Sequence, residues 1–189
     1  MLKHIAFIVG LACIGASCTT SQVKEDYTAS LLPTPAEVST QSGSYTLKKD
    51  VKIQAVDSSL IPAAQYLQEI LKNVAPESSV EPDGDIVLTL YSDTVGGAYR
   101  LEVLSDKIMI AGSDYAGVIN GISTLRQLLP PAAEMIQGDD YNKVAGTLPA
   151  CTLPLVTISD SPKFQWGGMM LDASRHFWSK EEVKRMLDL

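Results

Sequence analysis

Cysteine is scarce in this sequence, which has three among 189 residues. Cys13 and Cys18 lie close to the N-terminus, and Cys151 stands alone in the rest of the chain. One cysteine can supply neither a disulfide framework nor a structural zinc cluster. We therefore expect the folded part of the chain to be stabilised by the packing of its side chains.

Positive charge is also in short supply. The chain has 15 lysines and arginines against 22 aspartates and glutamates, which gives a formal net charge of −7. A surface that binds nucleic acid needs positive charge to neutralise the phosphates, so nucleic acid is not an expected partner. Glycine-rich phosphate loops and zinc-ligand spacings are missing from the sequence as well, and no cofactor is expected.

The N-terminal apolar run is too short to span a bilayer, which takes about 20 apolar residues. It covers Ile5 to Ile14, follows the basic pair Lys3 and His4, and leads into the small residues Gly15, Ala16 and Ser17. A charged zone, an apolar zone and a zone of small residues are typical of an export signal. The sequence therefore predicts a signal peptide over residues 1–17.

The end of this leader resembles a bacterial lipoprotein processing site, in which a cysteine is acylated and becomes the new N-terminus. Cys18 is the predicted acylated residue, and the polar residues 18–30 suit a tether. Gly15 stands where such sites usually carry leucine, and Cys13 is a second candidate. We expect an exported protein of the periplasm or cell envelope, anchored to a membrane through a lipid on Cys18.

Short strands and helices that follow one another predict an α/β domain over residues 31–150. Apolar residues three and four positions apart predict helices over residues 60–74 and 114–129. Runs rich in β-branched and aromatic residues predict strands, the last three of them as an antiparallel meander. These runs are Tyr45 to Leu47, Val51 to Val56, Asp85 to Tyr91, Ala98 to Leu104 and Lys107 to Ala111. The predicted domain is therefore an antiparallel sheet with two helices.

Two glycines interrupt the second predicted helix, although glycine is a poor helix former. Gly117 and Gly121 are four residues apart and so lie on one face of the helix, where they leave a smooth groove. Close approach of this face to a sheet explains why the lost propensity is tolerated. The two glycines indicate packing and imply no chemistry.

The last part of the chain, residues 151–189, is expected to start a second domain after an acidic loop. Leu153 to Ile158 is predicted to be extended, and Trp166 to Leu171 is predicted to be a buried strand. Ser179 and Glu182 form a capping box, which predicts that a helix begins there. A strand, a loop and a helix make one unit of a (β/α)8 TIM barrel, so the sequence predicts the truncated start of such a barrel.

Polar side chains cluster directly after the predicted strand, at the end where TIM barrels carry their active sites. They are Asp172, Ser174, Arg175 and His176. The guanidinium fork of Arg175 can bind two neighbouring hydroxyls of a sugar. Two other interpretations stay open: Arg175 can form a structural ion pair with Asp172, and His176 can be an ordinary loop histidine.

Residues 172–177, Asp-Ala-Ser-Arg-His-Phe, resemble the signature at the first barrel strand of glycoside hydrolase family 20, the β-N-acetylhexosaminidases. Leu32 to Val38 is similar to the start of the family's non-catalytic α/β domain. Ala98 to Leu101, the glycine-containing helix and Val156 to Ile158 match later parts of it. The resemblance covers residues 31–189, and its motifs follow the family's order.

The resemblance implies that Arg175 binds hydroxyls of a terminal N-acetylhexosamine, with Asp172 and His176 supporting the site. It further implies release of terminal N-acetylglucosamine or N-acetylgalactosamine from glycans, with retention at the anomeric carbon. In such enzymes the substrate's own acetamido oxygen attacks that carbon, assisted by an adjacent Asp-Glu pair. No adjacent Asp-Glu pair occurs in this sequence, so we expect a fragment that is inactive alone. The alternative is a non-catalytic exported scaffold or glycan-binding lipoprotein.

Overall fold

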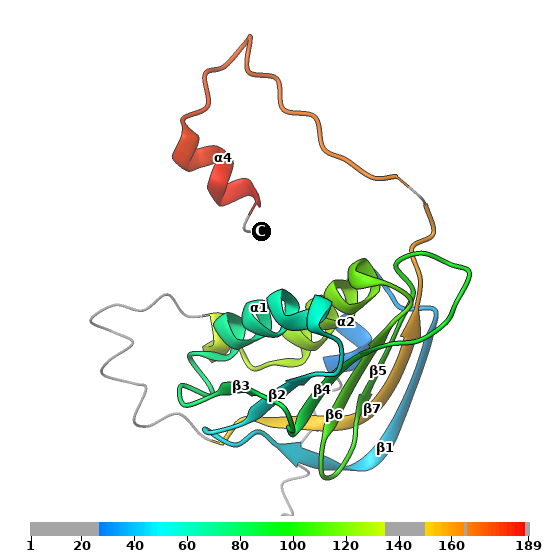
Figure 1. Ribbon diagram of the computed structural model, residues 1–189. Coiled ribbons are helices and arrows are strands. Elements are labelled where there is room, and N and C mark those ends of the chain that lie inside the picture. Colours follow the sequence, from blue (N-terminus) through cyan, green and yellow to red (C-terminus); the bar gives the residue numbers. More distant parts are fainter. Residues whose placement is uncertain (1–26, 135–149, 165, 188–189) are drawn as a thin grey trace, which may run out of the picture.

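The computed structural model describes residues 27–134, 150–164 and 166–187 (Figure 1). In this part of the chain seven strands form one sheet: β1 (Glu37–Thr46), β2 (Lys52–Ala55), β3 (Ser79–Glu81), β4 (Ile86–Leu90), β5 (Tyr99–Val103), β6 (Ile108–Gly112) and β7 (Thr152–Asp160). The α-helices are α1 (Ile61–Leu71), α2 (Tyr115–Leu128) and α4 (Lys180–Leu187). Short 3-10 helices are η1 (Tyr27–Ser30), η2 (Ser58–Leu60) and η3 (Pro131–Glu134).

The sheet is mixed, with the strand order β1-β7-β5-β6-β4-β2-β3. The pairs β1–β7, β7–β5 and β5–β6 are antiparallel, and the pairs β6–β4, β4–β2 and β2–β3 are parallel. The predicted α/β class is confirmed, but the sheet is antiparallel only on one side. The predicted meander is wrong because β6 lies between β4 and β5. A tight turn from Leu104 to Lys107 makes a hairpin of β5 and β6, whereas the longer connection from β4 to β5 leaves room for another strand between them.

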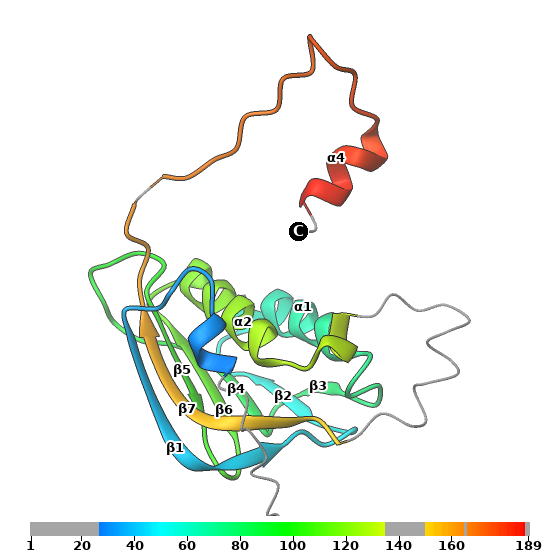
Figure 2. The same cartoon turned by 180° about the vertical axis from the view of Figure 1, so that it is seen from behind.

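The helices α1 and α2 cover one face of the sheet, as both views show (Figures 1 and 2). Side chains alternate between the two faces of a strand, and those on the helix side of β4, β5 and β6 are buried, except for Leu90 at the end of β4. The core includes Ile86, Leu88, Leu101, Ile108 and Ile110 from strands and Leu67, Leu71, Val118, Ile122 and Leu125 from helices. Burying one such side chain is worth about 1.5–3 kcal/mol, so this cluster holds the two layers together.

Both predicted helices form, and α2 begins as the sequence indicates. Asp114 precedes its first turn in an extended conformation, and the side chain accepts a 2.8 Å hydrogen bond from the backbone N–H of Gly117. The same carboxylate accepts the N–H of Gly97 at 3.1 Å, and the amide of Asn120 donates to the Gly97 carbonyl at 2.9 Å. The start of α2 therefore also fixes the connection between β4 and β5.

The expected close approach of α2 to the sheet is confirmed at both glycines. A Cβ on Gly117 would overlap the carbonyl oxygen of Ala98 and would lie 3.1 Å from the Cα of Gly112. A Cβ on Gly121 would lie 2.5 Å from Cγ2 of Ile110. Both distances are shorter than ordinary van der Waals contact, so any larger residue would push the helix from the sheet.

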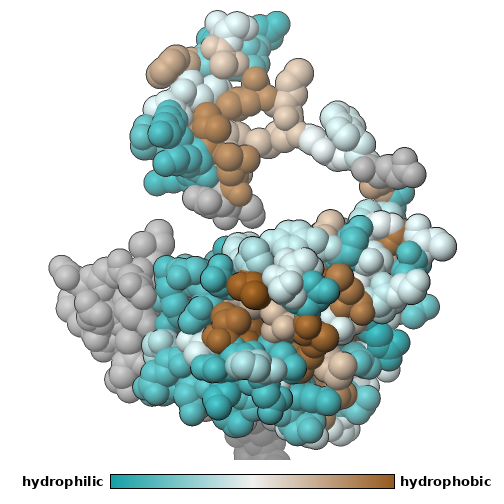
Figure 3. Space-filling model, in the orientation of Figure 1, coloured by the Kyte–Doolittle hydropathy of each residue, from teal (hydrophilic) through white to brown (hydrophobic). Residues whose placement is uncertain are grey.

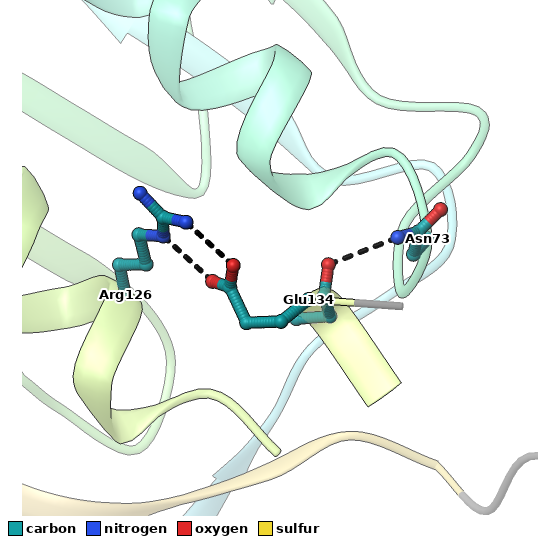
Figure 4. Close-up of polar contacts among 4 residues, drawn as sticks. Asn73, Arg126 and Glu134 are labelled. Carbon is teal, nitrogen blue, oxygen red and sulfur yellow. Dashed lines mark hydrogen bonds and ion pairs between the residues drawn. The ribbon is translucent and has the colours of Figure 1, made fainter. Parts of the chain in front are cut away.

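A polar clamp fixes η3 to both helices (Figure 4). Arg126 at the end of α2 donates from Nε to Glu134 Oε1 at 2.6 Å and from its terminal nitrogen to Oε2 at 2.5 Å. The amide of Asn73, which follows α1, donates to the carbonyl oxygen of Ala133 at 2.9 Å. The acidic loop expected between two domains continues through residues 135–149, outside the described residues, and the chain then returns to the same sheet as β7.

The position of β7 corrects the predicted domain boundary. Residues 151–189 were expected to belong to the second domain, but β7 lies between β1 and β5 in the sheet of the first. Its side chains Leu153, Val156 and Ile158 are buried in the common core, as is Cys151 just before it. Burial raises the pKa of the Cys151 thiol to about 11. The first domain therefore extends to Asp160, because the sheet is incomplete without this strand.

At the other end, the chain joins the body at Leu31, which is 2% exposed. The side chain of Gln127 on α2 both donates to the carbonyl and accepts the N–H of Leu32, each at 2.9 Å. The predicted signal peptide, Cys18 and most of the predicted tether fall in residues 1–26, outside the described part. Among the described residues, no helix is long and apolar enough to cross a membrane.

Candidate functional site

The segment with the predicted sugar-binding residues leaves the sheet after β7 and extends away from it (Figure 1). Residues 166–171 have no regular secondary structure, and Trp166 and Met170 are 85% and 91% exposed. The predicted buried strand is therefore not formed. A strand needs a neighbour to satisfy its backbone hydrogen bonds, and none of the described strands pairs with these residues.

A compact turn organises the residues that follow. The carboxylate oxygen Oδ1 of Asp172 accepts hydrogen bonds from the backbone N–H and the hydroxyl of Ser174, at 3.0 and 2.7 Å. It also accepts the backbone N–H of Arg175 at 3.2 Å. These bonds favour the charged form and lower the pKa of Asp172 below its usual range. Asp172 thus fixes the local backbone, in the manner of aspartates that begin turns.

The side chain of Arg175 returns toward the same carboxylate. Its Nε lies 3.4 Å from Oδ2 of Asp172, while the arginine side chain stays 90% exposed. A single long contact at such exposure contributes about 0–1 kcal/mol. The contact involves Nε and leaves the guanidinium exposed, so its terminal nitrogens can donate to a ligand. The ion-pair interpretation and the sugar-binding interpretation are therefore compatible.

His176 does not join this pair. Its ring makes an edge contact with Trp178, with centroids 5.0 Å apart and planes at 75°. Its charge also interacts with Glu182 at the start of α4. The structure thus brings two of the three predicted site residues together and places the third beside them in the chain.

The predicted capping box is confirmed at the start of α4. Glu182 accepts the backbone N–H and the hydroxyl of Ser179 at 2.8 and 2.9 Å, and its own N–H donates to that hydroxyl at 3.2 Å. The first two bonds lower the pKa of Glu182. Polar and apolar surfaces lie on opposite sides of this helix (Figure 3). Its apolar residues are Val183, Met186 and Leu187, and Leu187 is 76% exposed.

The first domain carries a second group of polar side chains, which the sequence did not single out. They line an open pocket of about 490 Å³ at the end of the sheet where β7 leaves it. Glu37, Tyr91, Arg100 and Ser159 come from four different strands or their ends. Because these residues are far apart in the sequence, only pairing of the strands brings them together.

Comparisons with known families and proteins agree with this division of the chain. Residues 28–161 match the model of glycosyl hydrolase family 20, domain 2. Residues 164–189 match the catalytic domain of the same family. The change from one match to the other follows β7 directly, in accord with the place of this strand in the first sheet.

Several relatives support the same assignment. A β-hexosaminidase of Vibrio furnissii is 31% identical over 162 residues, which cover 85% of this chain and 24% of the relative. A β-hexosaminidase of Porphyromonas gingivalis is 28% identical, over 100% of this chain and 25% of the relative. The chain thus spans about a quarter of the length of these relatives.

Solved structures resemble the fold closely. The N-acetyl-β-hexosaminidase of Streptomyces plicatus superimposes with a TM-score of 0.73 at 29% identity, over 85% of this chain and 32% of that one. The family 20 β-N-acetylhexosaminidase of Streptomyces coelicolor gives a TM-score of 0.70 at 29% identity, over 82% and 31% of the two chains. The chain therefore belongs to glycoside hydrolase family 20, with a match to domain 2 over residues 28–161 and a match to the catalytic domain over residues 164–189.

Proposed function

We propose that this chain is the N-terminal part of an exo-acting β-N-acetylhexosaminidase. The observation that carries the proposal is the Asp172 turn, which presents the exposed Arg175 guanidinium within the segment that matches the catalytic domain. A planar fork of donors is suited to two adjacent hydroxyls of a sugar ring. The substrates are glycans that end in N-acetylglucosamine or N-acetylgalactosamine.

In the proposed reaction, the acetamido oxygen of the substrate attacks the anomeric carbon and displaces the leaving group. A glutamic acid protonates the departing oxygen, a neighbouring aspartate steadies the acetamido group, and water then opens the cyclic intermediate with net retention. The role of this chain is binding: Arg175 binds the terminal sugar, and Asp172 fixes the backbone that carries Arg175. The acid and its aspartate neighbour belong to later strands of the proposed barrel, since no adjacent Asp-Glu pair occurs in the 189 residues.

The test uses a chromogenic N-acetyl-β-glucosaminide with two proteins. The 189-residue chain should show no turnover, and turnover that disappears in Arg175→Ala would show that a catalytic group has been missed. In a protein that joins this chain to a complete catalytic domain, Arg175→Ala should lower kcat/KM by at least about tenfold, the effect of losing one charged hydrogen bond. Arg175→Lys should recover little, because lysine lacks the fork.

The reading frame after Leu189 separates this proposal from a non-catalytic scaffold or glycan-binding lipoprotein. Further β/α units, with an Asp-Glu pair at the end of a later strand, support the enzyme. An immediate stop supports the non-catalytic protein. The sequence of the natural gene beyond this point decides between the two without any assay.

We further propose export and lipid attachment at Cys18. Support comes from the basic, apolar and small-residue zones of residues 1–17 and from the polar residues between Cys18 and the folded body. Growth with labelled palmitate should label the wild type and the Cys13→Ala variant but not Cys18→Ala. Label that remains in Cys18→Ala and is lost in Cys13→Ala would assign the acylated position to Cys13.

A further inference from the structure

We propose that the pocket at the end of the sheet binds an uncharged saccharide unit, at a site separate from the catalytic domain. The pocket has a volume of about 490 Å³, within the usual range of about 300–1,000 Å³ for small-molecule sites. It belongs to the first domain alone.

The floor of the pocket is a row of side chains across four neighbouring strands. Glu37 pairs with Ser159, which pairs with Arg100, which in turn pairs with Ala111. The residues next to this row along the strands, such as Leu101, point to the buried helix side. Because side chains alternate, the row faces the side of the sheet that α1 and α2 leave uncovered.

The connection between β4 and β5 forms the wall. Tyr91 and Asp93 line the pocket, and Asp93 fixes the turn by accepting the backbone N–H groups of Thr94 at 2.6 Å and Val95 at 3.1 Å. Burial, and then the nearby charge of Asp93, raise the pKa of the Tyr91 phenol. The wall is therefore an uncharged aromatic ring with a carboxylate beside it, held in place by its own backbone.

The polar groups of the pocket suit hydroxyls as ligands. The guanidinium of Arg100 is oriented by Glu102, at 2.9 Å from its terminal nitrogen, and offers further donors. Glu37, Asp93 and the hydroxyl of Ser159 offer acceptors. The ring of Tyr91 and the methyl group of Ala111 supply apolar surface for the C–H groups of a sugar ring.

The charge of the pocket selects against acidic ligands. Two carboxylates, from Glu37 and Asp93, line it, and the guanidinium of Arg100, which also lines it, is already paired with Glu102. An anionic group would meet a net negative charge here, whereas an uncharged sugar would meet donors and acceptors without repulsion. The charge of the lining excludes anions, and its donors, acceptors and apolar surface together favour a sugar. Only the choice of N-acetylglucosamine as a probe rests on the proposed function.

The experiment is an NMR titration of the 189-residue chain with N-acetylglucosamine, glucose and glucuronic acid. We expect saturable shifts of the amide signals of residues 91–100 and 159–161 with one or both neutral sugars, and none with glucuronic acid. Arg100→Met and Tyr91→Ala should each weaken binding at least about tenfold, the loss expected for one charged hydrogen bond or one aromatic contact. Arg185→Met and Tyr115→Ala are the matched controls on exposed surface and should leave binding unchanged.

Several results would overturn the inference. One is the absence of saturable shifts with both neutral sugars. Another is that the shifts lie in residues 172–177 and disappear in Arg175→Ala, which would assign binding to the other site. A third is that the shifts at the pocket disappear in a protein with the complete catalytic domain, since the pocket would then be a contact between domains. Failure of the proposed hydrolase function would appear instead as missing turnover in that longer protein, with sugar binding at Arg100 intact.

Discussion

Replacing Gly117 by alanine tests the close contact between α2 and the sheet. In an unhindered helix this change would stabilise the protein by about 1 kcal/mol, because alanine is the better helix former. Here the new methyl group would overlap the backbone carbonyl of Ala98, and a backbone group cannot rotate aside as a side chain can. Overpacking of this kind costs about 1–3 kcal/mol, and the rigid obstacle favours the upper end.

The expected net effect of Gly117→Ala is a loss of about 1–2 kcal/mol in the free energy of unfolding, which corresponds to about 3–10 °C in Tm for a domain of this size. Thermal and urea unfolding followed by circular dichroism measure it. Gly167→Ala is the matched control, since its methyl group would meet no atom within 4 Å. Ser123→Ala controls for helix propensity on the exposed side of α2. A Gly117→Ala protein that is more stable than wild type would refute the proposed contact.

Three further predictions concern polar groups. Asp114→Ala should destabilise the domain by about 1–2 kcal/mol in urea unfolding, because it removes the helix cap and the hydrogen bond to Gly97. Asp114→Asn should keep most of that stability, and equal losses in the two variants would contradict the capping role. Ser179→Ala should reduce the helical Cα chemical shifts of α4 in NMR spectra without moving the main unfolding midpoint, because this helix is exposed. Unchanged chemical shifts would argue against the capping box. Hydrogen bonds from Arg126 lower the pKa of Glu134 in the folded protein. The ion pair therefore stabilises the protein fully at a pH above the ordinary carboxylate pKa. This stabilisation is lost as the pH falls through the lowered pKa of Glu134. Glu134→Gln should therefore cost up to about 1 kcal/mol at pH 7 and less toward pH 3, and a difference that is constant with pH would contradict the mechanism.

Local features of the fold were predictable because they depend on neighbours in the sequence. The three-and-four spacing of apolar residues located α1 and α2, and Ser179 and Glu182 marked the start of α4 through bonds that span three residues. The same spacing placed Gly117 and Gly121 on the face of α2 that touches the sheet. Strand patterns also located most strands, although β1 is longer than Tyr45 to Leu47, because its exposed first half forms only through pairing with β7.

In the candidate site, contacts between sequence neighbours could be predicted, and contacts between distant strands could not. The ion pair between Asp172 and Arg175 depends on residues three positions apart, and the structure contains it, whereas the hydrogen bonds of Asp172 to the backbone were not predicted. The buried strand expected over residues 166–171 depends on a partner strand, and among the described residues it has none. The pocket around Arg100 left no local signal, because its residues meet only when β1, β5 and β7 pair.

The sequence by itself determined the approximate positions of the helices, the capping box at Ser179, the resemblance to the family and the ion pair of Asp172 with Arg175. Each of these depends on contacts within a few residues. Only the tertiary structure decided the strand order, the place of β7 in the first domain and the row of side chains from Glu37 to Ala111. Alternation along a strand specifies which face is buried, but it does not specify which strand lies alongside, and that choice depends on long-range packing around one core.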